Sequence, residues 1–483
     1  MSRNFDILLK NGTIIDGSGN EGFPSDVAIN GDRIIAIGYL KELATKTIDV
    51  SGKVICPGFI DVHTHDDNAV LKSPDCLPKI SQGVTTVIVG NCGLSAAPVR
   101  LKADPPNPLN LLGSKNDFNF PDFSSYVNHV NEIQPAVNVA ALVGHTSLRV
   151  NHMTDLYRAA NKEEIDAMSE ELHECLSQGA IGLSTGLAYD SALQSTTEEV
   201  ITLAKIVHEC DGIYVTHMRN EFDKIIDAMN EAFTIGQSAD IPVVISHLKC
   251  AGPDNWGRSE EVLNFIARSK YKDRIHMDCY PYAAGSSTLD LGQVDERVDI
   301  LITWSDPYPE QSTRYLHEIA QEWKVSLLEA ARKLQPAGAV YFSIEEEDMK
   351  KIISHPKTMI GSDGLPHDPH PHPRLWGTFP KVLGDLSGKQ QLFKVSEAVH
   401  KMTGLSAANF NLEERGLIKE GYFADITIFD PEKIMDKATF EKPKTMSDGI
   451  EMVIVNGTQT FSHWKATNHR SGRYIGRKQK KEL

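Results

Sequence analysis

The sequence predicts an α/β protein: a (β/α)8 barrel of the TIM type, joined to a small β domain and interrupted by a long, lid-like insertion. Three observations lead to this fold. Segments typical of strands and of helices alternate through the middle of the chain, strand-like segments gather at both ends, and one late connection is far longer than the others. With 483 residues, 41% of them hydrophobic, the chain is long enough to bury a large barrel and a smaller domain.

Strand-like segments near both ends of the chain predict the small β domain. Residues 7–17 consist of two apolar runs around Asn11-Gly12, and residues 27–37 repeat the pattern around Asn30-Gly31. An Asn-Gly step between apolar runs is a strong signal for a tight β-hairpin. Two further strand-like runs, near the other end of the chain, are residues 424–429 and 452–457. We therefore expect residues 1–59 and 415–483 to form one small β domain.

Alternating strands and helices predict a barrel over residues 60–414. The buried-strand runs are residues 84–89, 137–143, 181–184, 213–217, 241–247 and 274–279. Apolar residues recur at helical spacing in residues 161–178, 196–210, 221–237 and 259–270. Short strands that alternate with helices are typical of βα units in a parallel sheet, and a closed barrel is the natural outcome of so many units.

One connection breaks this rhythm. About seventy residues lie between Tyr282 and Met359, several times the usual length of a βα connection. They include a predicted helix, Ser326 to Leu334. We assign residues 286–350 to an insertion within the barrel and expect it to act as a lid over the catalytic mouth. An inert surface subdomain is the alternative.

Composition and charge narrow the classes of partner. The net charge of −16 repels phosphates, so we expect neither a nucleic acid nor a membrane as a partner. The first residues lack the apolar stretch of a signal peptide, and no apolar run is long enough to span a membrane. Seven scattered cysteines do not indicate a disulfide framework, which favours a cytoplasmic location. We expect a small-molecule partner. The oligomeric state stays open, with a monomer as one option.

Two histidines, His63 and His65, follow the apolar run Gly58-Phe59-Ile60-Asp61-Val62. Residues 54–58 are predicted to form a turn that leads into this run. Side chains of a strand alternate with period 2, so the two imidazoles point the same way and could chelate one metal ion. A single His-X-His is weak evidence, because many such pairs are surface residues.

Further metal-capable side chains stand at the ends of the predicted strands. In a barrel these ends form the catalytic face. A lone histidine there is most often an ordinary buried polar group, and Cys92 alone could be a small residue beside glycines. So many metal-capable side chains at the ends of successive strands indicate a metal site, and imidazole and thiolate ligands favour zinc. The residues are His63, His65, Cys92, His145, His217, His247 and Asp363.

Longer motifs around these residues resemble a known family. The run that leads to His63-Thr64-His65, the histidines that end two later strands and Asp363 resemble the amidohydrolase superfamily, whose composite β domain the terminal segments match. More narrowly, several motifs resemble the N-acyl-D-amino-acid deacylases (D-aminoacylases). They are residues 79–86, Gly90-Asn91-Cys92-Gly93, Gly144-His145-Thr146, Thr216-His217-Met218-Arg219, Ser246-His247-Leu248-Lys249, residues 278–282 and residues 361–369. The resemblance covers essentially the whole chain.

This resemblance implies a zinc-dependent hydrolase that cleaves the amide bond of N-acyl-D-amino acids to a carboxylate and a free D-amino acid. Many superfamily members bridge two metal ions with a carboxylated lysine, but residues 140–145 contain no lysine. In the deacylase branch a cysteine takes this place. The resemblance therefore implies one tightly held Zn²⁺, with Cys92, His217 and His247 as ligands. It also implies a second, weaker site, formed by His63, His65, Asp363 and Cys92.

Asp363 is the candidate catalytic residue, because amide hydrolysis needs a group that takes a proton from water and passes it to the leaving nitrogen. It could instead merely cap a helix. Lys249 lies two residues after His247, on the same strand face, and is a candidate to bind the substrate carboxylate. The resemblance adds Tyr282 and Arg374 as carboxylate partners, with Tyr341 and Ile344 lining the side-chain pocket. An isoleucine in that pocket favours apolar D-amino acids over acidic ones.

Two other functions remain open on the sequence. One is a cyclic-amide hydrolase of the hydantoinase or dihydroorotase type, against which the missing lysine and the Gly-Asn-Cys-Gly motif argue. The other is a catalytically inactive homologue that serves as a scaffold, although such a protein should have lost ligand residues. His370 and His372 alternate with prolines in residues 368–373, which predicts a stiff, extended loop and no second metal site.

Overall fold

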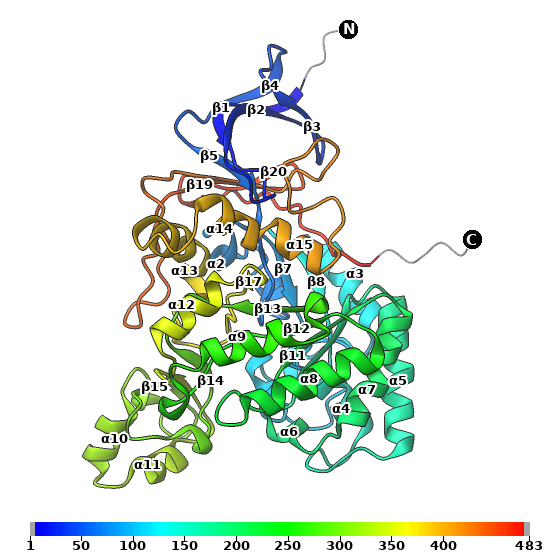
Figure 1. Cartoon of the computed structure of the whole chain (residues 1–483), viewed down its shortest axis with the longest axis vertical. Coiled ribbons are helices and arrows are strands. Elements are labelled where there is room, and N and C mark those ends of the chain that lie inside the picture. Colours follow the sequence, from blue (N-terminus) through cyan, green and yellow to red (C-terminus); the bar gives the residue numbers. More distant parts are fainter. Residues whose placement is uncertain (1–4, 478–483) are drawn as a thin grey trace.

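The computed structural model describes residues 5–477. Figure 1 shows three parts along the long axis of the molecule. A sheet built from both ends of the chain lies at the top, parallel strands with helices around them form the middle, and the insertion lies at the bottom. The predicted α/β class with parallel strands is confirmed.

The sheet at the top has nine strands and combines segments from the two ends of the chain. Its order is β21-β20-β19-β18-β5-β1-β2-β3, and β4 pairs with β1. The junction of the two ends is the antiparallel pair of β5 and β18. The strands are β1 (Phe5–Ile14), β2 (Phe23–Asn30), β3 (Arg33–Gly38), β4 (Ala44–Asp49), β5 (Val54–Pro57), β18 (Ile426–Phe429), β19 (Ile450–Val455), β20 (Thr458–Ser462) and β21 (Lys465–Ala466).

Two local predictions for this sheet were wrong. Asn11-Gly12 does not turn a hairpin, because β1 runs on through it and pairs with β2 on both sides of an irregularity between Leu9 and Gly12. Asn11 takes a φ of 63°, and its N–H donates to the Asp26 carboxylate at 2.9 Å, as in a β-bulge. The predicted turn at residues 54–58 contains strand β5. The predicted hairpin of β2 with β3 is confirmed, and β19 and β20 form another.

Nine parallel strands in two groups form the middle of the molecule. Their orders are β17-β13-β12-β11-β10-β9 and β6-β7-β8. Leu142 alone separates β8 from β9, and beyond β6 and β17 the N–H of Asp363 donates to the carbonyl of His63 at 2.7 Å. The strands are β6 (Phe59–Asp61), β7 (Val84–Val89), β8 (Asn138–Ala141), β9 (Val143–Gly144), β10 (Gly182–Gly186), β11 (Ile213–His217), β12 (Val243–Ile245), β13 (Ile275–Cys279) and β17 (Thr358–Ile360).

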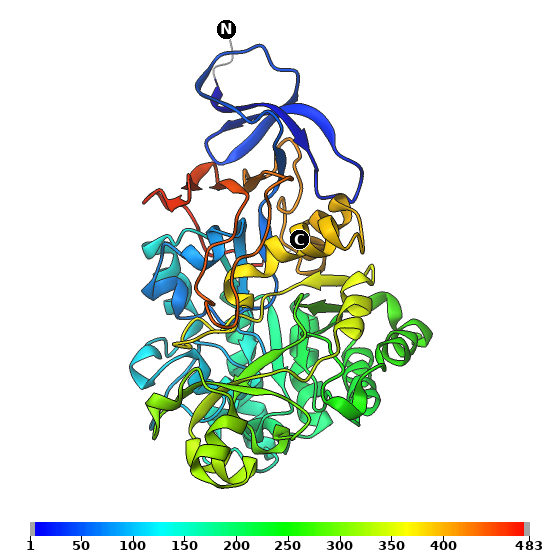
Figure 2. The same cartoon turned by 90° about the vertical axis from the view of Figure 1, so that its left-hand side faces the viewer.

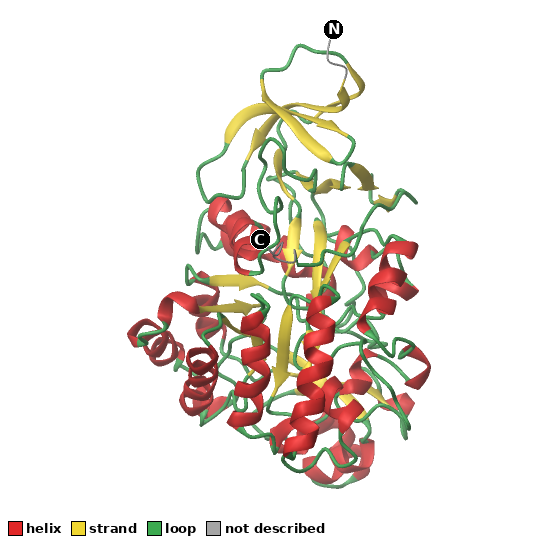
Figure 3. Ribbon diagram, turned by 90° about the vertical axis from the view of Figure 1, so that its right-hand side faces the viewer, coloured by secondary structure: helices red, strands yellow, loops and turns green. Residues whose placement is uncertain are grey.

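Helices lie on the outer side of these strands (Figure 3). The four helices predicted between the strands are confirmed as α5 (Lys162–Ser177), α7 (Thr197–Glu209), α8 (Ile225–Ala239) and α9 (Ser259–Arg268). The others outside the insertion are α1 (Ala69–Lys72), α2 (Leu77–Ile80), α3 (Phe123–Ile133), α4 (His145–His152), α6 (Asp190–Leu193), α12 (Glu346–Ser354), α13 (Arg374–Lys381), α14 (Val395–Met402) and α15 (Gly404–Asn409). None of the helices within residues 5–477 is long and apolar enough to cross a membrane.

The long connection folds into a compact unit with a sheet of its own, at the end of the molecule opposite the nine-stranded sheet (Figure 2). The strands β14 (Gly285–Thr288), β15 (Ile300–Ser305) and β16 (Ala337–Tyr341) form an antiparallel sheet in the order β14-β16-β15. Helices α10 (Leu316–Trp323) and α11 (Leu327–Leu334) pack on it. The predicted helix is confirmed as α11, and the Ser326 side chain caps its start.

Residues 365–373, the proline-rich loop, connect the site strand β17 to α13 and contact the insertion. The imidazole Nε2 of His372 bonds the carbonyl of Ala284 at 3.0 Å, and that of His370 bonds the carbonyl of Phe440 at 2.6 Å. Asp368 is buried beside the Thr303 hydroxyl on β15, and this burial raises the pKa of its carboxyl from 3.8 to about 7. The loop is therefore held between the insertion and a C-terminal segment.

Asp368→Asn should stabilise the protein at alkaline pH. The folded protein keeps the Asp368 proton up to about pH 7, whereas the unfolded chain loses it near its ordinary pKa of 3.8. The folded state thus binds more protons in this window, and the free energy of unfolding falls as the pH rises, by about 1.4 kcal/mol per pH unit. Asparagine keeps the shape without the charge. Thermal melting should favour the variant above neutral pH and show almost no difference near pH 4; equal melting temperatures in alkaline buffer would contradict this account.

Candidate active site

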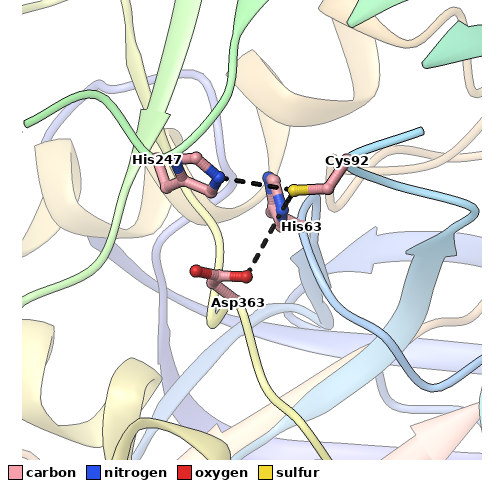
Figure 4. A group of neighbouring side chains, drawn as sticks. All are labelled: His63, Cys92, His247 and Asp363. Atoms are coloured by element: carbon pink, nitrogen blue, oxygen red, sulfur yellow. Dashed lines mark hydrogen bonds and ion pairs between the residues drawn. The ribbon is translucent and has the colours of Figure 1, made fainter. Parts of the chain in front are cut away.

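Four side chains from distant parts of the chain meet at one point (Figure 4). The Sγ atom of Cys92 lies 3.2 Å from Nε2 of His63 and 3.3 Å from Nε2 of His247. Asp363 closes the group, with Oδ1 3.5 Å from Nε2 of His63. All four residues are buried, and their ligand atoms lie within 4.8 Å of one another.

The topology of the parallel strands produces this convergence. His63, Cys92, His247 and Asp363 follow the last residues of β6, β7, β12 and β17 by two or three positions, and His217 is the last residue of β11. The carboxyl ends of parallel strands meet at one edge, so these side chains share one site. The remaining predicted ligands complete it. Nε2 of His65 lies 3.3 Å from Oδ1 of Asp363, and the ring of His217 packs edge-on against His247 with centroids 4.5 Å apart.

Three of these residues have left-handed backbone conformations. The φ angles are 54° at Cys92, 34° at His247 and 47° at Asp363. Residues with a Cβ atom rarely adopt this region, and they persist there only where the surroundings hold them. The Asp278 carboxylate supplies one such restraint, because its Oδ1 accepts the N–H of His247 at 2.8 Å. The backbone strain therefore lies at the residues whose side chains form the cluster.

The charges of the site are strongly coupled. Burial alone would raise the pKa of the Cys92 thiol, but His63 and His247 hold it well below its usual value. Burial would likewise raise the pKa of Asp363, and the Arg374 guanidinium brings it well below its usual value. Nη1 of Arg374 lies 2.9 Å from Oδ2 of Asp363. The Asp363 carboxyl is therefore ionised at neutral pH, and the Cys92 thiol loses its proton more readily than an ordinary cysteine. Other buried cysteines, such as Cys76 and Cys279, have pKa values raised to about 12 by burial.

The residues fit a zinc ion. A thiolate, imidazole nitrogens and a carboxylate form the donor set that zinc prefers. Nδ1 of His63 faces the Asp278 carboxylate at 3.3 Å, which leaves Nε2 turned towards Cys92. Metal-ligating histidines usually carry such a carboxylate on their other nitrogen. Asp278 was not among the site residues predicted from the sequence. Its position at the end of β13, level with the strand-end histidines, was the available signal.

A buried lysine lies beneath the site. Nζ of Lys79 on α2 contacts the Asp61 carboxylate at 2.7 Å and the Asp66 carboxylate at 2.9 Å. It also donates to the hydroxyls of Thr64 and Ser362, at 2.9 and 3.0 Å. These contacts join the segment that carries His63 and His65 to the segment that carries Asp363. Lys79 was part of a recognised motif, but nothing in its local sequence indicated this role.

Cationic groups lie beside the metal-capable cluster. Lys249 contacts His247 and Glu221, with Nζ 2.8 Å from Nδ1 of His247 and 2.7 Å from Oε1 of Glu221. Arg374, with 1% of its surface exposed, lies over the ring of Tyr280 at 4.6 Å. Within the described chain, Nε of Arg374 and the Tyr280 hydroxyl are buried without a hydrogen-bond partner. Burial raises the pKa of Tyr280 to about 12, although both Lys249 and Arg374 oppose this shift.

The other predicted substrate contacts lie farther from the cluster. The ring of Tyr282 packs edge-on against His372 with centroids 5.1 Å apart, and Lys381 lies 5.3 Å above it. The Tyr341 hydroxyl is used within the insertion, where it donates to the carbonyl of Thr288 at 2.9 Å. Ile344 is buried and pairs through a β-bridge with Ala251, two residues after Lys249. Tyr280, which the sequence analysis did not select, is the tyrosine next to Arg374.

Two further side chains, His145 and Glu221, differ in their relation to the cluster. His145, one of the metal-capable residues at the predicted strand ends, binds Glu199 through Nε2 at 2.9 Å and lies outside the cluster. Glu221, which the sequence analysis did not select, contacts three of the predicted site residues: His217, His247 and Lys249. The available signal was its position four residues after His217, beyond the end of β11.

The chain is similar to known proteins over nearly its whole length. A profile of the amidohydrolase family matches residues 46–258 and 319–461. The D-aminoacylase of Alcaligenes xylosoxydans xylosoxydans is 48% identical over 477 residues, which is 99% of this chain and 98% of that protein.

Solved structures give the same result. A structure of D-aminoacylase with a binuclear metal centre, in which one metal activates and the second attenuates, is 48% identical with a TM-score of 0.96; the match covers 98% of this chain and 100% of that one. The N-acyl-D-glutamate deacylase of Bordetella bronchiseptica, complexed with zinc and a phosphonate that mimics the tetrahedral intermediate, is 41% identical with a TM-score of 0.95 and the same coverage. The chain belongs to the amidohydrolase family.

Proposed function

We propose that the protein is a zinc-dependent hydrolase that cleaves the amide bond of N-acyl-D-amino acids and releases a carboxylate and a free D-amino acid. One observation carries this proposal. A cysteine whose thiol pKa is held well below its usual value lies among strand-end histidines, with Asp363 beside it, in a chain 48% identical to a D-aminoacylase over 99% of its length. A cyclic-amide hydrolase is the second candidate, but no observation on this chain favours it.

The architecture supports the catalytic proposal. We propose that the two groups of parallel strands close into one eight-stranded barrel, with β8 and β9 as a single interrupted strand and with the bonds between His63 and Asp363 as the seam. Within the predicted ranges 1–59 and 415–483, the described residues 5–59 and 415–477 then form the small β domain, and residues 60–414 form the barrel. Residues 286–350 form a lid, which the hydrogen bond from Nη2 of Arg374 to the carbonyl of Ser286 on β14 supports. Seven free cysteines favour a cytoplasmic location.

Cys92, His217 and His247 would hold one Zn²⁺ tightly. His63 and His65, with Asp363 and Cys92, would hold a second ion more weakly. A bound zinc ion lowers the pKa of water and polarises a carbonyl, which is the chemistry that amide hydrolysis requires. The carboxylate Oδ1 of Asp363 faces His63 and His65, while Oδ2 is held by Arg374. In this proposal, Asp363 accepts a proton from the attacking water at Oδ1 and delivers it to the leaving nitrogen.

Cationic and hydroxyl donors beside the cluster would bind the α-carboxylate of the substrate. We propose Arg374, Lys249 and Tyr280 for this role, with Tyr280 in the position that the sequence analysis gave to Tyr282. Buried polar groups without a partner are rare in proteins because desolvating them is unfavourable. A substrate carboxylate would supply the acceptor that Nε of Arg374 and the Tyr280 hydroxyl lack. Tyr341 and Ile344 stay as candidates for the side-chain pocket.

Asp363→Ala should abolish turnover while most of the zinc stays bound, because Cys92, His217 and His247 are intact. The measurement is zinc content by mass spectrometry alongside the rate of release of a D-amino acid. The arginine partner of Asp363 provides a comparison: Arg374→Ala should raise KM more than it lowers kcat. Near-normal activity of Asp363→Ala would remove Asp363 from the mechanism.

Tyr280→Phe and Tyr282→Phe form a matched pair, because each removes one buried hydroxyl. Losing a hydrogen bond to a charged partner costs about 1.5–3 kcal/mol, which is roughly 10- to 100-fold in kcat/KM. We expect this loss for Tyr280→Phe on an N-acetyl-D-amino acid, mostly through KM, and little change on the carboxamide analogue of that substrate. Tyr282→Phe should resemble the wild type. The reverse pattern would return the role to Tyr282.

Substrate and metal dependence can be tested together on the wild-type enzyme. N-acetyl-D-amino acids should be hydrolysed, and the corresponding L-compounds and a cyclic imide should not. Prolonged treatment with a strong chelator should remove the activity, and added zinc should restore it. Activity that survives complete loss of metal would contradict the zinc requirement. Hydrolysis of the cyclic imide in preference to the linear amide would support the second candidate function.

A further inference from the structure

We propose that Glu221 is a positioning residue that aims the His247 imidazole at the metal and holds the Lys249 ammonium at the edge of the site. This inference rests on the proposed function and gives a role to a carboxylate that the mechanism above does not use. Glu221 has 6% of its surface exposed and lies between the end of β11 and the start of α8.

The two ring nitrogens of His247 have different surroundings. Nε2 faces the Cys92 thiolate at 3.3 Å. Nδ1 has two polar neighbours, Oε1 of Glu221 at 3.0 Å and Nζ of Lys249 at 2.8 Å. A histidine that binds a metal through Nε2 carries its proton on Nδ1, and only the Glu221 carboxylate can accept that proton, because the Lys249 ammonium is itself a donor. In that tautomer the ammonium donates to Oε1 of Glu221 and to the His247 carbonyl in place of Nδ1. Glu221 therefore fixes the tautomer and the ring orientation that metal binding through Nε2 requires.

The same carboxylate oxygen also holds Lys249. Oε1 of Glu221 lies 2.7 Å from Nζ, and the ammonium donates in addition to the carbonyl of His247 at 3.1 Å. A buried ammonium without a counter-charge is costly, and the Glu221 carboxylate supplies the counter-charge of Lys249. Lys249 is consequently held in place before the substrate carboxylate arrives. One side chain thereby sets both the metal ligand and the carboxylate partner.

The backbone of Glu221 is restrained as well. Its carbonyl accepts the N–H of Ala251 at 2.9 Å, which ties the loop after β11 to the loop that follows Lys249. The other carboxylate oxygen, Oε2, lies 3.7 Å from Nε2 of His217. The carboxylate is thus placed between two predicted zinc ligands from neighbouring strands, β11 and β12.

Glu221 could instead be a metal ligand, because His217, Glu221 and His247 also form a group with metal-ligand spacing. The position of Lys249 argues against this. Its ammonium contacts both Oε1 of Glu221 and Nδ1 of His247, so an ion bound by these two atoms would have to displace it. A cation is therefore already present there, supplied by the chain itself. The geometry favours a positioning role.

Glu221→Gln tests the proposal, because glutamine keeps the shape and removes the charge. The readout is zinc affinity of the purified protein, measured by competition with a chromophoric chelator. Removing an outer carboxylate partner typically weakens metal binding by about 10- to 100-fold, and we expect a loss in this range. KM for an N-acetyl-D-amino acid should rise as well, because Lys249 is no longer held. The metal-free variant should also melt below the metal-free wild type, because the Lys249 ammonium loses its counter-charge.

Glu231→Gln is the matched control. Glu231 on α8 is another mostly buried carboxylate with a cationic partner, since its Oε2 lies 2.9 Å from Nε of Arg219, but it has no contact with the metal-capable cluster. This control should bind zinc as tightly as the wild type. Should Glu221→Gln fail to fold, Glu221→Asp, which draws the charge back by one methylene group, must lose zinc affinity in the same direction.

The outcomes separate the two proposals. If the wild type binds zinc and Glu221→Gln binds it equally well, the positioning role is wrong and the proposed function stands. If the variant loses thermal stability without losing zinc affinity, Glu221 is purely structural and the inference is again wrong. A wild-type protein that binds no zinc at all overturns both. A loss of zinc affinity in Glu221→Gln and not in Glu231→Gln supports the inference.

Discussion

The buried Lys79 ammonium is the interaction on which the site depends most. It lies between the carboxylates of Asp61 and Asp66 and also donates to hydroxyls on the segments after β6 and β17. Those segments carry His63, His65 and Asp363. Removing one partner from a buried ion group typically costs 3–5 kcal/mol, because it leaves an uncompensated charge. One cation thus fixes the relative position of the segments that follow β6 and β17, where the chemistry takes place.

Around this anchor, the site concentrates both strain and charge. Cys92, His247 and Asp363 adopt left-handed backbone conformations that side chains with a Cβ atom rarely take. Each of these side chains is also coupled to a charged partner: Cys92 to imidazoles, Asp363 to Arg374, and His247 to Glu221. This combination of strained backbone and buried charges is by itself unfavourable for folding. It is stable here because the parallel strands and the buried charges hold it from several sides.

Sequence patterns predicted the strand ends well and the loops poorly. His217 and His247 could be placed together because strand period and parallel topology leave few alternatives. Tyr280 could not be distinguished from Tyr282, since both lie beyond the end of β13, where the alternation of side chains no longer applies. Glu221 likewise lies on a loop, and its contacts depend on residues from β12. At Asn11 the local signal suits a hairpin and a bulge equally, and only the pairing of β1 with β2 on both sides decides between them.

The proline-rich loop links two segments that are distant from it in the sequence, the insertion and the segment around Phe440. His372 binds the carbonyl of Ala284 at the base of the insertion, His370 binds the carbonyl of Phe440, and Arg374 donates to the carbonyl of Ser286. Arg374 follows the loop directly and pairs with Asp363. The insertion is therefore not an independent module. A relative could not exchange it for another of the same length unless the loop and the segment around Phe440 changed with it. We therefore expect these three segments to vary together among relatives.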